Sequence, residues 1–343
     1  MSFNIVIILM IKVLFVSSEK SNKFGVSKVV NSLKKNLQKK IRLKFSNSII
    51  NFIKYKPNLI HIHGCWNLKL LLFFLFSKLV SAKVILSPHG MINPISFNQK
   101  KIKKLIGWHI YQKLMFLNSD LIIVNSSLEK KNLQYRINSK NKIYVIPHGI
   151  DVKPKKNIIK FSLNSKLRFV FFSRIHPSKN LEKLINIWTK NTFLKNFNLS
   201  IYGEITDHKY FYKIKNKILN AANIKYRGPL YSNNHLVLSK YDVFLLPSKS
   251  ENFGLVVLEA MSSGLYILLN KNLPWKILQT KGFGKLININ STTLVKEVKK
   301  LELIKAKIRN KKFKKKLLQF LKKNYDWKKL SDIYLSKYKS VFY

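Results

Sequence analysis

Short apolar runs alternate along the chain with longer segments in which apolar residues recur at helical spacing. A short apolar run between polar or turn residues is typical of a buried strand, and Val26–Leu37 has the spacing of an amphipathic helix. This alternation predicts an α/β fold built on parallel sheets. The runs that predict strands begin at Lys12, Lys56, Val84, Asp120 and Lys142, and then at Leu167, Leu199, Lys225, Val243 and Tyr266.

One strand–loop–helix unit, residues 241–270, contains the clearest candidate chemistry. Val243–Leu246 predicts a buried strand, the polar residues after it predict a loop, and Gly254 begins a helix. Glu251 lies in the loop and Glu259 on the helix, with seven residues between them. The unit therefore places two carboxylates around the start of a helix.

A helix that begins at the mouth of a parallel sheet offers free backbone N–H groups and a positive dipole end, which together attract phosphate. Two carboxylates beside such a phosphate could accept hydrogen bonds from sugar hydroxyls. Carboxylates are scarce in this chain, which has 14 Asp and Glu in 343 residues. The spacing of Glu251 and Glu259 also fits a capped core helix with two surface glutamates, and on spacing alone that interpretation is favoured.

The segment that begins at Pro247 resembles the E-x7-E signature of the retaining glycosyltransferases of family 4, PSxxExFGLxxLEAMxxGxPVI. The resemblance implies that Glu251 is catalytic and holds the hydroxyls of a nucleotide-diphosphate sugar, and that Glu259 binds the nucleotide ribose. It also implies that the residues after Glu251 bind the donor, with backbone N–H groups stabilising the leaving diphosphate. These residues are Asn252, Phe253, Gly254 and Leu255.

Two cations follow the strand that begins at Leu167. Arg174 and Lys179 lie on either side of the next loop, where fixed positive charge can neutralise a diphosphate. Lys179 alone carries little weight, because a chain with this many lysines places many of them in solvent. Together the two cations resemble the family's GRLxxxKG element, with Ser173 in place of its glycine. The resemblance implies that both cations are catalytic and that Ser173 contacts the donor.

The first half contains weaker landmarks. Gly25 precedes a helix, where a glycine lets a ligand approach the backbone closely, and it is a candidate donor-binding residue. His89 lies at the end of a predicted strand in a PHGM segment and, in isolation, fits a structural histidine in a turn. The family has this segment too, which implies that His89 is catalytic and positions the donor sugar near the acceptor. His61 and His63 share one side of a strand, but no third metal ligand is visible at a suitable spacing.

The resemblance covers residues 12–342 and implies an α/β fold of the GT-B type, with two doubly wound Rossmann-like domains facing a cleft. Residues 1–152 are expected to bind the acceptor and residues 153–324 the nucleotide sugar. Residues 325–343 are expected to form a terminal helix that crosses back to the N-terminal domain. The implied function is a retaining glycosyltransferase (a hexosyltransferase) acting on a lipid-linked or surface-polysaccharide intermediate of lipopolysaccharide, O-antigen or capsule synthesis.

Two other function classes stay open. One is a GT-B enzyme that epimerises nucleotide sugars, and the other is a basic binding protein without activity. A nucleic-acid partner is not expected, since no RNP-like or helix-turn-helix signature occurs. The chain has no D-x-D motif, so we expect no metal and no cofactor beyond the nucleotide-diphosphate sugar that serves as donor substrate. The sequence does not identify the donor sugar, the base, the acceptor, the linkage or the oligomeric state.

The charge of the chain is +51, from 65 Lys and Arg against 14 Asp and Glu. A field of this size attracts an anionic membrane surface, although a compositional bias towards Lys, Asn and Ile explains it equally well. Residues 26–40 and 102–116 combine lysines with apolar residues and are the candidate membrane-facing segments. The Lys-rich residues 301–323 are expected to form a domain-packing helix, with membrane attachment as the alternative.

Location and processing are predicted from the same composition. The single cysteine, Cys65, excludes an internal disulfide and fits a reducing cytosol. The longest apolar run after residue 20, residues 68–80, is too short to span a bilayer. The apolar residues 1–9 are interpreted as an upstream extension rather than a signal peptide. We therefore expect a cytoplasmic protein, with peripheral attachment to the cytoplasmic face of the membrane as its candidate location.

Overall fold

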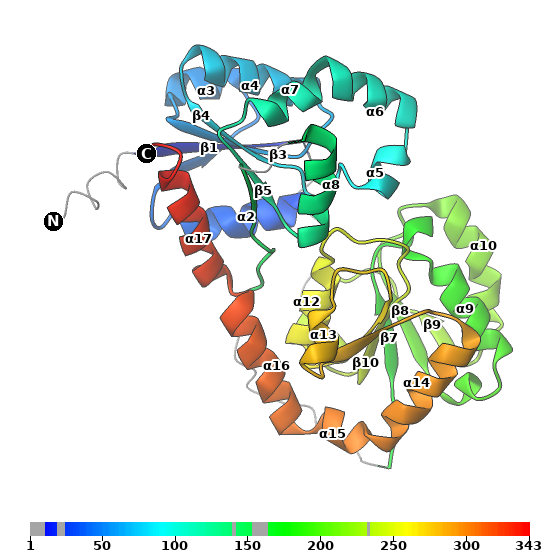
Figure 1. Ribbon diagram of the computed structural model, residues 1–343. Helices are drawn as coiled ribbons and strands as arrows, with labels where there is room; N and C mark the ends of the chain where they lie inside the picture. Colours follow the sequence, from blue (N-terminus) through cyan, green and yellow to red (C-terminus); the bar gives the residue numbers. More distant parts are fainter. Residues whose placement is uncertain (1–10, 19–24, 139–141, 153–163, 232–233) are drawn as a thin grey trace. The chain divides into compact units, whose positions relative to one another are not determined.

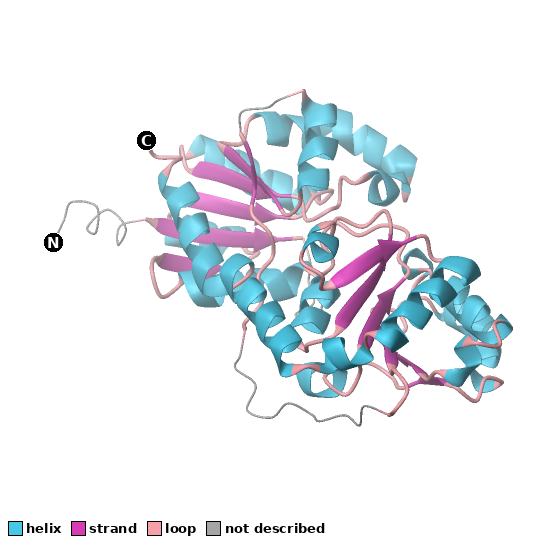
Figure 2. Ribbon diagram, turned by 60° about the horizontal axis from the view of Figure 1, so that its bottom comes forward, coloured by secondary structure: helices cyan, strands magenta, loops and turns pink. Residues whose placement is uncertain are grey.

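The computed structural model describes residues 11–18, 25–138, 142–152, 164–231 and 234–343. The chain divides into two compact units, the first formed by Met1–Gly149 with Tyr325–Tyr343 and the second by Ile150–Asn324 (Figure 1). The proposed extension at residues 1–9 and the start of the second predicted domain at residue 153 lie outside the described residues. Each unit is built on its own parallel sheet of six strands, as the alternation of strand and helix predicts (Figure 2).

The sheet of the first unit has the strand order β2-β1-β3-β4-β5-β6, and all its pairings are parallel. The four central strands are buried at nearly every position, which explains their continuous apolar sequences. The strands are β1 (Lys12–Ser17), β2 (Arg42–Phe45), β3 (Leu59–His63), β4 (Lys83–Ser87), β5 (Leu121–Val124) and β6 (Ile143–Val145).

Helices cover both faces of this sheet (Figure 1). Right-handed crossovers place α2 on one face and α3, α4, α6, α7 and α8 on the other. The C-terminal helix α17 contacts α2 and lies on the same face. Lys40, after α2, donates to Asp332 of α17 at 2.6 Å. The helices are α2 (Val26–Leu37), α3 (Ile49–Tyr55), α4 (Leu68–Leu79), α5 (Pro94–Asn98), α6 (Lys101–Gly107), α7 (Lys113–Leu117), α8 (Ser127–Ile137) and α17 (Trp327–Lys339).

The helix predicted for residues 103–116 is interrupted by one wide π turn, η1 (Trp108–Gln112), between α6 and α7. Trp108 and Gln112, the first and last residues of this turn, are both buried. Gln112 there accepts a hydrogen bond from the backbone N–H of Trp66 at 2.9 Å. The chain is thus helical from Lys101 to Leu117, as predicted, with one wider turn at its middle.

The sheet of the second unit has the order β12-β11-β10-β7-β8-β9, again wholly parallel. Its strands are β7 (Phe169–Phe172), β8 (Leu199–Tyr202), β9 (Ile224–Tyr226), β10 (Val243–Leu246), β11 (Tyr266–Asn270) and β12 (Gly284–Ile287). Its α-helices are α9 (Leu181–Lys190), α10 (His208–Leu219), α11 (Asn234–Leu238), α12 (Leu255–Ser262), α13 (Ile277–Thr280), α14 (Ser291–Leu303), α15 (Lys305–Arg309) and α16 (Lys311–Asn324), with short 3-10 turns η2 (Pro177–Lys179) and η3 (Leu194–Asn196).

The predicted Lys-rich helix at residues 301–323 consists of the end of α14, the short α15 and then α16. Phe313, Leu317 and Leu321 of α16 are buried on one side and α16 contacts α12, so this region packs within the unit as predicted. The break at α15 places Arg309 where its Nη2 lies 2.9 Å from Oδ2 of Asp242, a buried carboxylate before β10.

Each sheet has one point where the strand order reverses. In the first unit the reversal lies between β1 and β3, and in the second between β7 and β10. The loops that leave these strands diverge to opposite faces, which leaves a crevice at the carboxyl ends where ligands bind in open α/β sheets. In the second unit those loops carry Arg174 and Lys179, after β7, and Glu251, after β10.

Candidate functional site

Glu251 receives two hydrogen bonds at the reversal point of the second unit. Nζ of Lys179 donates to Oε1 of Glu251 at 2.5 Å, and Oγ of Ser248 donates to the same oxygen at 2.8 Å. The side chains of Lys179 and Glu251 are 11% and 10% exposed, so the ion pair is shielded from bulk water. Shielding makes each charge depend strongly on its partner.

The two loops at this point are bound to each other and to a third strand. Nδ2 of Asn180 donates to the carbonyl oxygen of Pro247 at 3.2 Å, and the backbone N–H of Lys249 donates to the carbonyl oxygen of Ser178 at 3.0 Å. Nδ2 of Asn270, at the end of β11, donates to the carbonyl oxygen of Ser248 at 3.1 Å. The ends of three neighbouring strands therefore fix the Lys179–Glu251 pair before any ligand binds.

The turn into helix α12 requires a glycine. Gly254 has φ of 85°, a left-handed conformation that residues with a Cβ adopt at a cost. Nε1 of Trp275 donates to the carbonyl oxygen of Phe253 at 2.5 Å, and the two rings lie 5.1 Å apart. This contact fixes the backbone that precedes the first helical residue, Leu255. The predicted donor-binding segment is thus held by a tryptophan that the sequence did not single out.

The other residues predicted for this site lie around the same strand ends. Ser173 is buried at the end of β7, where its N–H donates to the carbonyl oxygen of Tyr202 at 3.1 Å. Arg174 follows it and is exposed, while Asn252 and Glu259 are half-buried, Glu259 one turn into α12. The structure brings Lys179 and Glu251 into direct contact and leaves the Arg174 side chain accessible to a ligand.

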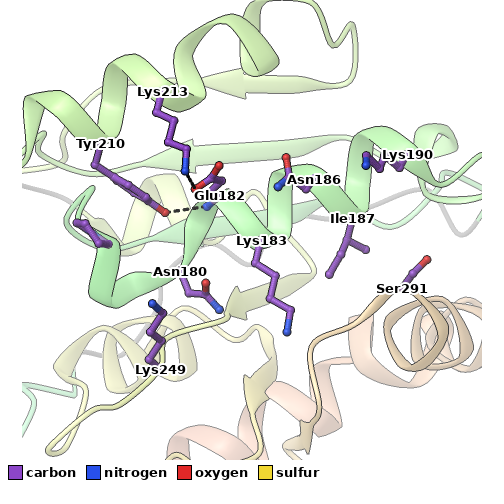
Figure 3. A pocket seen from close by; sticks show the side chains of 11 residues that line it. Asn180, Glu182, Lys183, Asn186, Ile187, Lys190, Tyr210, Lys213, Lys249 and Ser291 are labelled. Carbon is purple, nitrogen blue, oxygen red and sulfur yellow. Dashed lines mark hydrogen bonds and ion pairs between the residues drawn. The ribbon is translucent and has the colours of Figure 1, made fainter. Parts of the chain in front are cut away.

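A pocket of about 720 Å³ lies on the outer side of α9 (Figure 3). Asn180 and Lys249 line it, but their neighbours Lys179 and Glu251 do not. On its wall the backbone N–H of Glu182 donates to the hydroxyl of Tyr210 at 2.8 Å. The pocket is therefore separate from the predicted donor site, although the two share loops.

In the first unit the side chain of His89 is bound at both ring nitrogens. Nδ1 lies 3.1 Å from Oδ1 of Asn125, and Nε2 lies 3.0 Å from Nδ1 of His63. Nδ2 of Asn125 donates to the carbonyl oxygen of Ile146 at 3.0 Å, which fixes the amide so that its oxygen faces His89. His89 must therefore carry its proton on Nδ1 and accept from His63 through Nε2.

Four histidines of the first unit, His61, His63, His89 and His148, form one cluster. His61 and His63 of β3 lie 3.9 Å apart by their ring centroids, and the rings of His89 and His148 are stacked at 5.5 Å. Burial lowers the pKa of all four imidazoles, that of His89 to about 4, although the hydrogen bond to Asn125 partly opposes this shift. The cluster is uncharged at neutral pH, so His89 does not supply a cation there.

The C-terminal helix completes this cluster. The hydroxyl of Tyr338, on α17, lies 2.6 Å from Nδ1 of His61, and Oγ of Ser87 lies 2.8 Å from Nε2 of the same ring. Trp327 at the start of α17 packs against Gly149, where a Cβ would lie 2.5 Å from the indole. Helix α17 is therefore part of the structure that holds His89.

A buried carboxylate fixes the His89 loop from the other side. Glu129 of α8 is fully buried; it accepts hydrogen bonds from the backbone N–H of Gly90 and, at 2.8 Å, from that of Asn125. Its own N–H donates to Oγ of Ser126 at 3.1 Å. Glu129 was not predicted from the sequence, although Ser126-x-x-Glu129 is a capping-box pattern that marks the start of a helix.

Gly25 stands at the start of α2 with φ of 59° and ψ of −121°, a conformation open to glycine. This agrees with a loop in which a ligand approaches the backbone closely. Within the described ranges no three His, Cys, Asp or Glu side chains are grouped so that they could hold a metal ion.

Comparison with known proteins assigns both halves of the chain. Residues 154–325 match the family described as glycosyl transferases group 1, and residues 12–153 match the family described as glycosyltransferase family 4. The chain belongs to the group 1 glycosyltransferases, and it is a transferase enzyme.

Among curated relatives, an uncharacterised 41.2 kDa protein of the cps region of Klebsiella pneumoniae is 27% identical over 73% of this chain and 71% of its own length. A probable sucrose-phosphate synthase of Thermosipho melanesiensis is 28% identical over 62% of this chain and 53% of its own length.

Solved structures share the fold. HepE of Anabaena, crystallised with UDP, has a TM-score of 0.75 at 15% identity and covers 96% of this chain and 100% of its own. Sucrose-phosphate synthase of Thermosynechococcus elongatus has a TM-score of 0.79 at 14% identity and covers 96% and 99%. The predicted α/β fold of the GT-B type is confirmed.

Proposed function

We propose that this enzyme is a retaining glycosyltransferase that transfers a sugar from a nucleotide-diphosphate sugar to a glycan or lipid-linked acceptor. The second unit would bind the donor and the first the acceptor. The observation that carries the proposal is the shielded Lys179–Glu251 pair, held between the two loops where the strand order reverses. The start of α12 adds free backbone N–H groups at the same strand ends.

The donor-side chemistry follows from these charges. Transfer breaks the bond between the anomeric carbon and a diphosphate oxygen, so negative charge grows on the diphosphate. Arg174 and Lys179, with the backbone N–H groups around Phe253 and Gly254, would stabilise that charge. Glu251 would accept hydrogen bonds from the sugar hydroxyls, which replace Lys179 as donors when Lys179 turns to the diphosphate. Glu259 would accept from the nucleotide ribose.

His89 would act by position rather than by proton transfer. Both its ring nitrogens bond to protein atoms, and burial lowers its pKa to about 4, so it neither accepts nor donates a proton readily at neutral pH. The fixed, neutral ring of His89 would instead help to hold the donor sugar in position next to the acceptor. Gly25, at the first reversal point, would let the substrate approach the backbone.

We further propose that the reaction needs no metal ion, because Arg174 and Lys179 supply positive charge where other enzymes use Mg²⁺. HepE binds UDP and UDP-glucose, which makes uridine nucleotides the first donors to test.

The acceptor class is supported by similar proteins. The Klebsiella relative is encoded in a cps region, and the similar structure WaaG is described as involved in lipopolysaccharide biosynthesis, with a TM-score of 0.64 at 12% identity. An intermediate of surface polysaccharide at the cytoplasmic face of the membrane fits the charge of +51, which attracts anionic lipid.

The direct test incubates the protein with radiolabelled UDP- and GDP-sugars, with and without lipid-linked acceptors, and determines the anomeric configuration of the product. We expect acceptor-dependent transfer with retention, and a higher melting temperature in the presence of the cognate nucleotide. Isomerisation of the sugar without any acceptor would instead indicate an epimerase. Failure of every nucleotide to bind would contradict both activities and leave a basic binding protein.

A further inference from the structure

Helix α4 is mostly apolar but only its inner side is covered. Its inner side is buried in the core of the first unit through Leu70, Phe73 and Phe74. Its outer side carries four leucines at helical spacing that are about half exposed or more. These are Leu68, Leu72, Leu75 and Leu79, at 65%, 48%, 48% and 79%. A helix with this composition is normally buried on every side, so the outer leucines lack the environment that their sequence predicts.

The helical rod from α6 through η1 to α7 repeats this arrangement. Trp108, Met115 and Phe116 face the core. Four large aliphatic residues at intervals of four positions face outwards, and each is more than half exposed. These are Ile102, Ile106, Ile110 and Leu114, at 76%, 54%, 66% and 53%. Single exposed apolar residues are ordinary, but two ordered rows of them are not.

The two rows lie on neighbouring elements. Trp66, immediately before α4, donates its backbone N–H to Gln112 of η1 at 2.9 Å, and its ring lies 6.3 Å from that of Trp108. Both elements cover the same face of the sheet (Figure 1). We call the eight residues of the two rows the apolar face.

The charges around the apolar face select its occupant. The sequence contains no Asp or Glu between Glu19 and Asp120, so all the charged side chains of α4, α6, η1 and α7 themselves are cationic. Asp120 lies 3.5 Å from Lys78 at the end of α4 and offsets part of that charge. Lys69 and Lys78 lie on α4, and Lys101 and Lys103 on α6, all exposed. A second copy docked through the same face would bring lysines against lysines, which is unfavourable. An anionic bilayer offers hydrocarbon to the leucines and phosphate to the lysines.

We propose that the apolar face inserts into the headgroup region of an anionic membrane, so that the first unit is held by buried side chains as well as by charge. No helix among the described residues is long and apolar enough to cross a bilayer, and the proposed attachment needs none. The biological purpose of this attachment rests on the proposed membrane-side acceptor. The attachment itself is tested separately, because lipid binding is measured without catalysis. Two segments were predicted to face the membrane. Residues 102–116 form most of the rod of α6, η1 and α7, whereas the apolar residues of α2, in the other segment, are buried.

The test measures co-sedimentation with phosphatidylcholine vesicles, with and without phosphatidylglycerol, at low salt and at 1 M NaCl. Attachment by charge alone ends at high salt, because screening shortens the field to about 3 Å. We expect wild-type protein to bind the anionic vesicles and to stay partly bound at high salt. The variant L72S/L75S/I106S/I110S should lose at least about tenfold in partitioning, most clearly at high salt.

The matched control is L219S/L236S, which removes two equally exposed leucines from α10 and α11 of the second unit and should bind as wild type. Unchanged melting temperatures show that both variants fold. Complete release of wild type by salt, or equal binding by the four-residue variant, would overturn insertion while leaving the transferase activity intact. Self-association without lipid that the same four substitutions abolish would also overturn it, in favour of a dimer interface.

Discussion

Lys179 and Glu251 form an ion pair, with Nζ of the lysine 2.5 Å from Oε1 of the glutamate. The two residues come from loops 72 positions apart that meet where the strand order of the second sheet reverses. The family resemblance assigns one residue to the diphosphate and the other to the sugar. In the proposed roles, binding of the diphosphate to Lys179 and of the sugar to Glu251 would be coupled through this contact.

The first prediction concerns this coupling. Lys179→Ala should lower kcat/KM by about a hundredfold or more, because it removes a cation from the leaving group and leaves Glu251 unpaired in a shielded site. Glu251→Ala should have an effect of similar size, and the double variant should be less than additive, since both residues act as one unit.

The control for this double-mutant cycle is Lys249→Ala, which removes an exposed lysine from the loop that carries Glu251. Steady-state kinetics of wild type and the four variants decides the question. If Lys179→Ala turns over like Lys249→Ala, the ion pair is structural and Lys179 has no part in the chemistry.

The second prediction concerns metal. If Arg174 and Lys179 stabilise the diphosphate, transfer should proceed at an unchanged rate in excess EDTA. The measurement is the initial rate before and after chelation, followed by addition of Mg²⁺ or Mn²⁺. Loss of activity that either ion restores would show that the cations do not replace a metal.

The third prediction concerns Glu129. Glu129→Gln should destabilise the first unit by about 3 kcal/mol, because an amide cannot accept from both Gly90 and Asn125 as the buried carboxylate does. Urea unfolding measures the change. Glu182→Gln is the control, since its carboxylate pairs with surface lysines at 21% side-chain exposure and should contribute less than about 1 kcal/mol. Equal effects of the two substitutions would exclude a special role for Glu129.

The fourth prediction concerns pH. Burial holds the pKa of His89 at about 4 and lowers those of His61, His63 and His148, whereas the unfolded chain titrates near 6.5. Between these values the unfolded state binds more protons, so the free energy of unfolding falls as the pH drops from about 6.5 towards 4. Each such proton adds a slope of about 1.4 kcal/mol per pH unit. We expect stability to be constant above pH 7.

His148→Asn tests the origin of this slope, because asparagine does not titrate. The urea midpoint should depend less steeply on pH in this variant, and His208→Gln, at an exposed position, should leave the slope unchanged. An identical slope in all three proteins would assign the acid sensitivity to groups outside the cluster.

The sequence was informative where chemistry and local structure coincide in one segment. The run from Val243 to Met261 combines strand, loop and helix signals. Both the turn from β10 into α12 and the position of Glu251 in that turn could therefore be predicted. The fold class followed from the same alternation repeated along the chain.

The network around His89 could not be predicted in this way. Asn125 is 36 positions from His89, Glu129 is 39 positions from Gly90, and Tyr338 is 277 positions from His61, so only packing brings these partners together. Periodicity shows that Tyr338 lies on the buried side of a helix, but not that its hydroxyl meets His61. The same limit applies to the Lys179–Glu251 contact, which depends on strand order rather than on spacing.

Helix α17 also sets the order in which the protein can mature on the ribosome. The first unit is translated before the second, yet the hydroxyl that pairs with His61 comes from Tyr338, beyond the whole of the second unit. Synthesis proceeds at about 5–20 residues per second, so the histidine cluster lacks its α17 partner while residues 150–324 emerge and can fold. The domain that is made first is therefore the last to be finished, and a nascent chain released before α17 would carry a complete second unit beside an open first one.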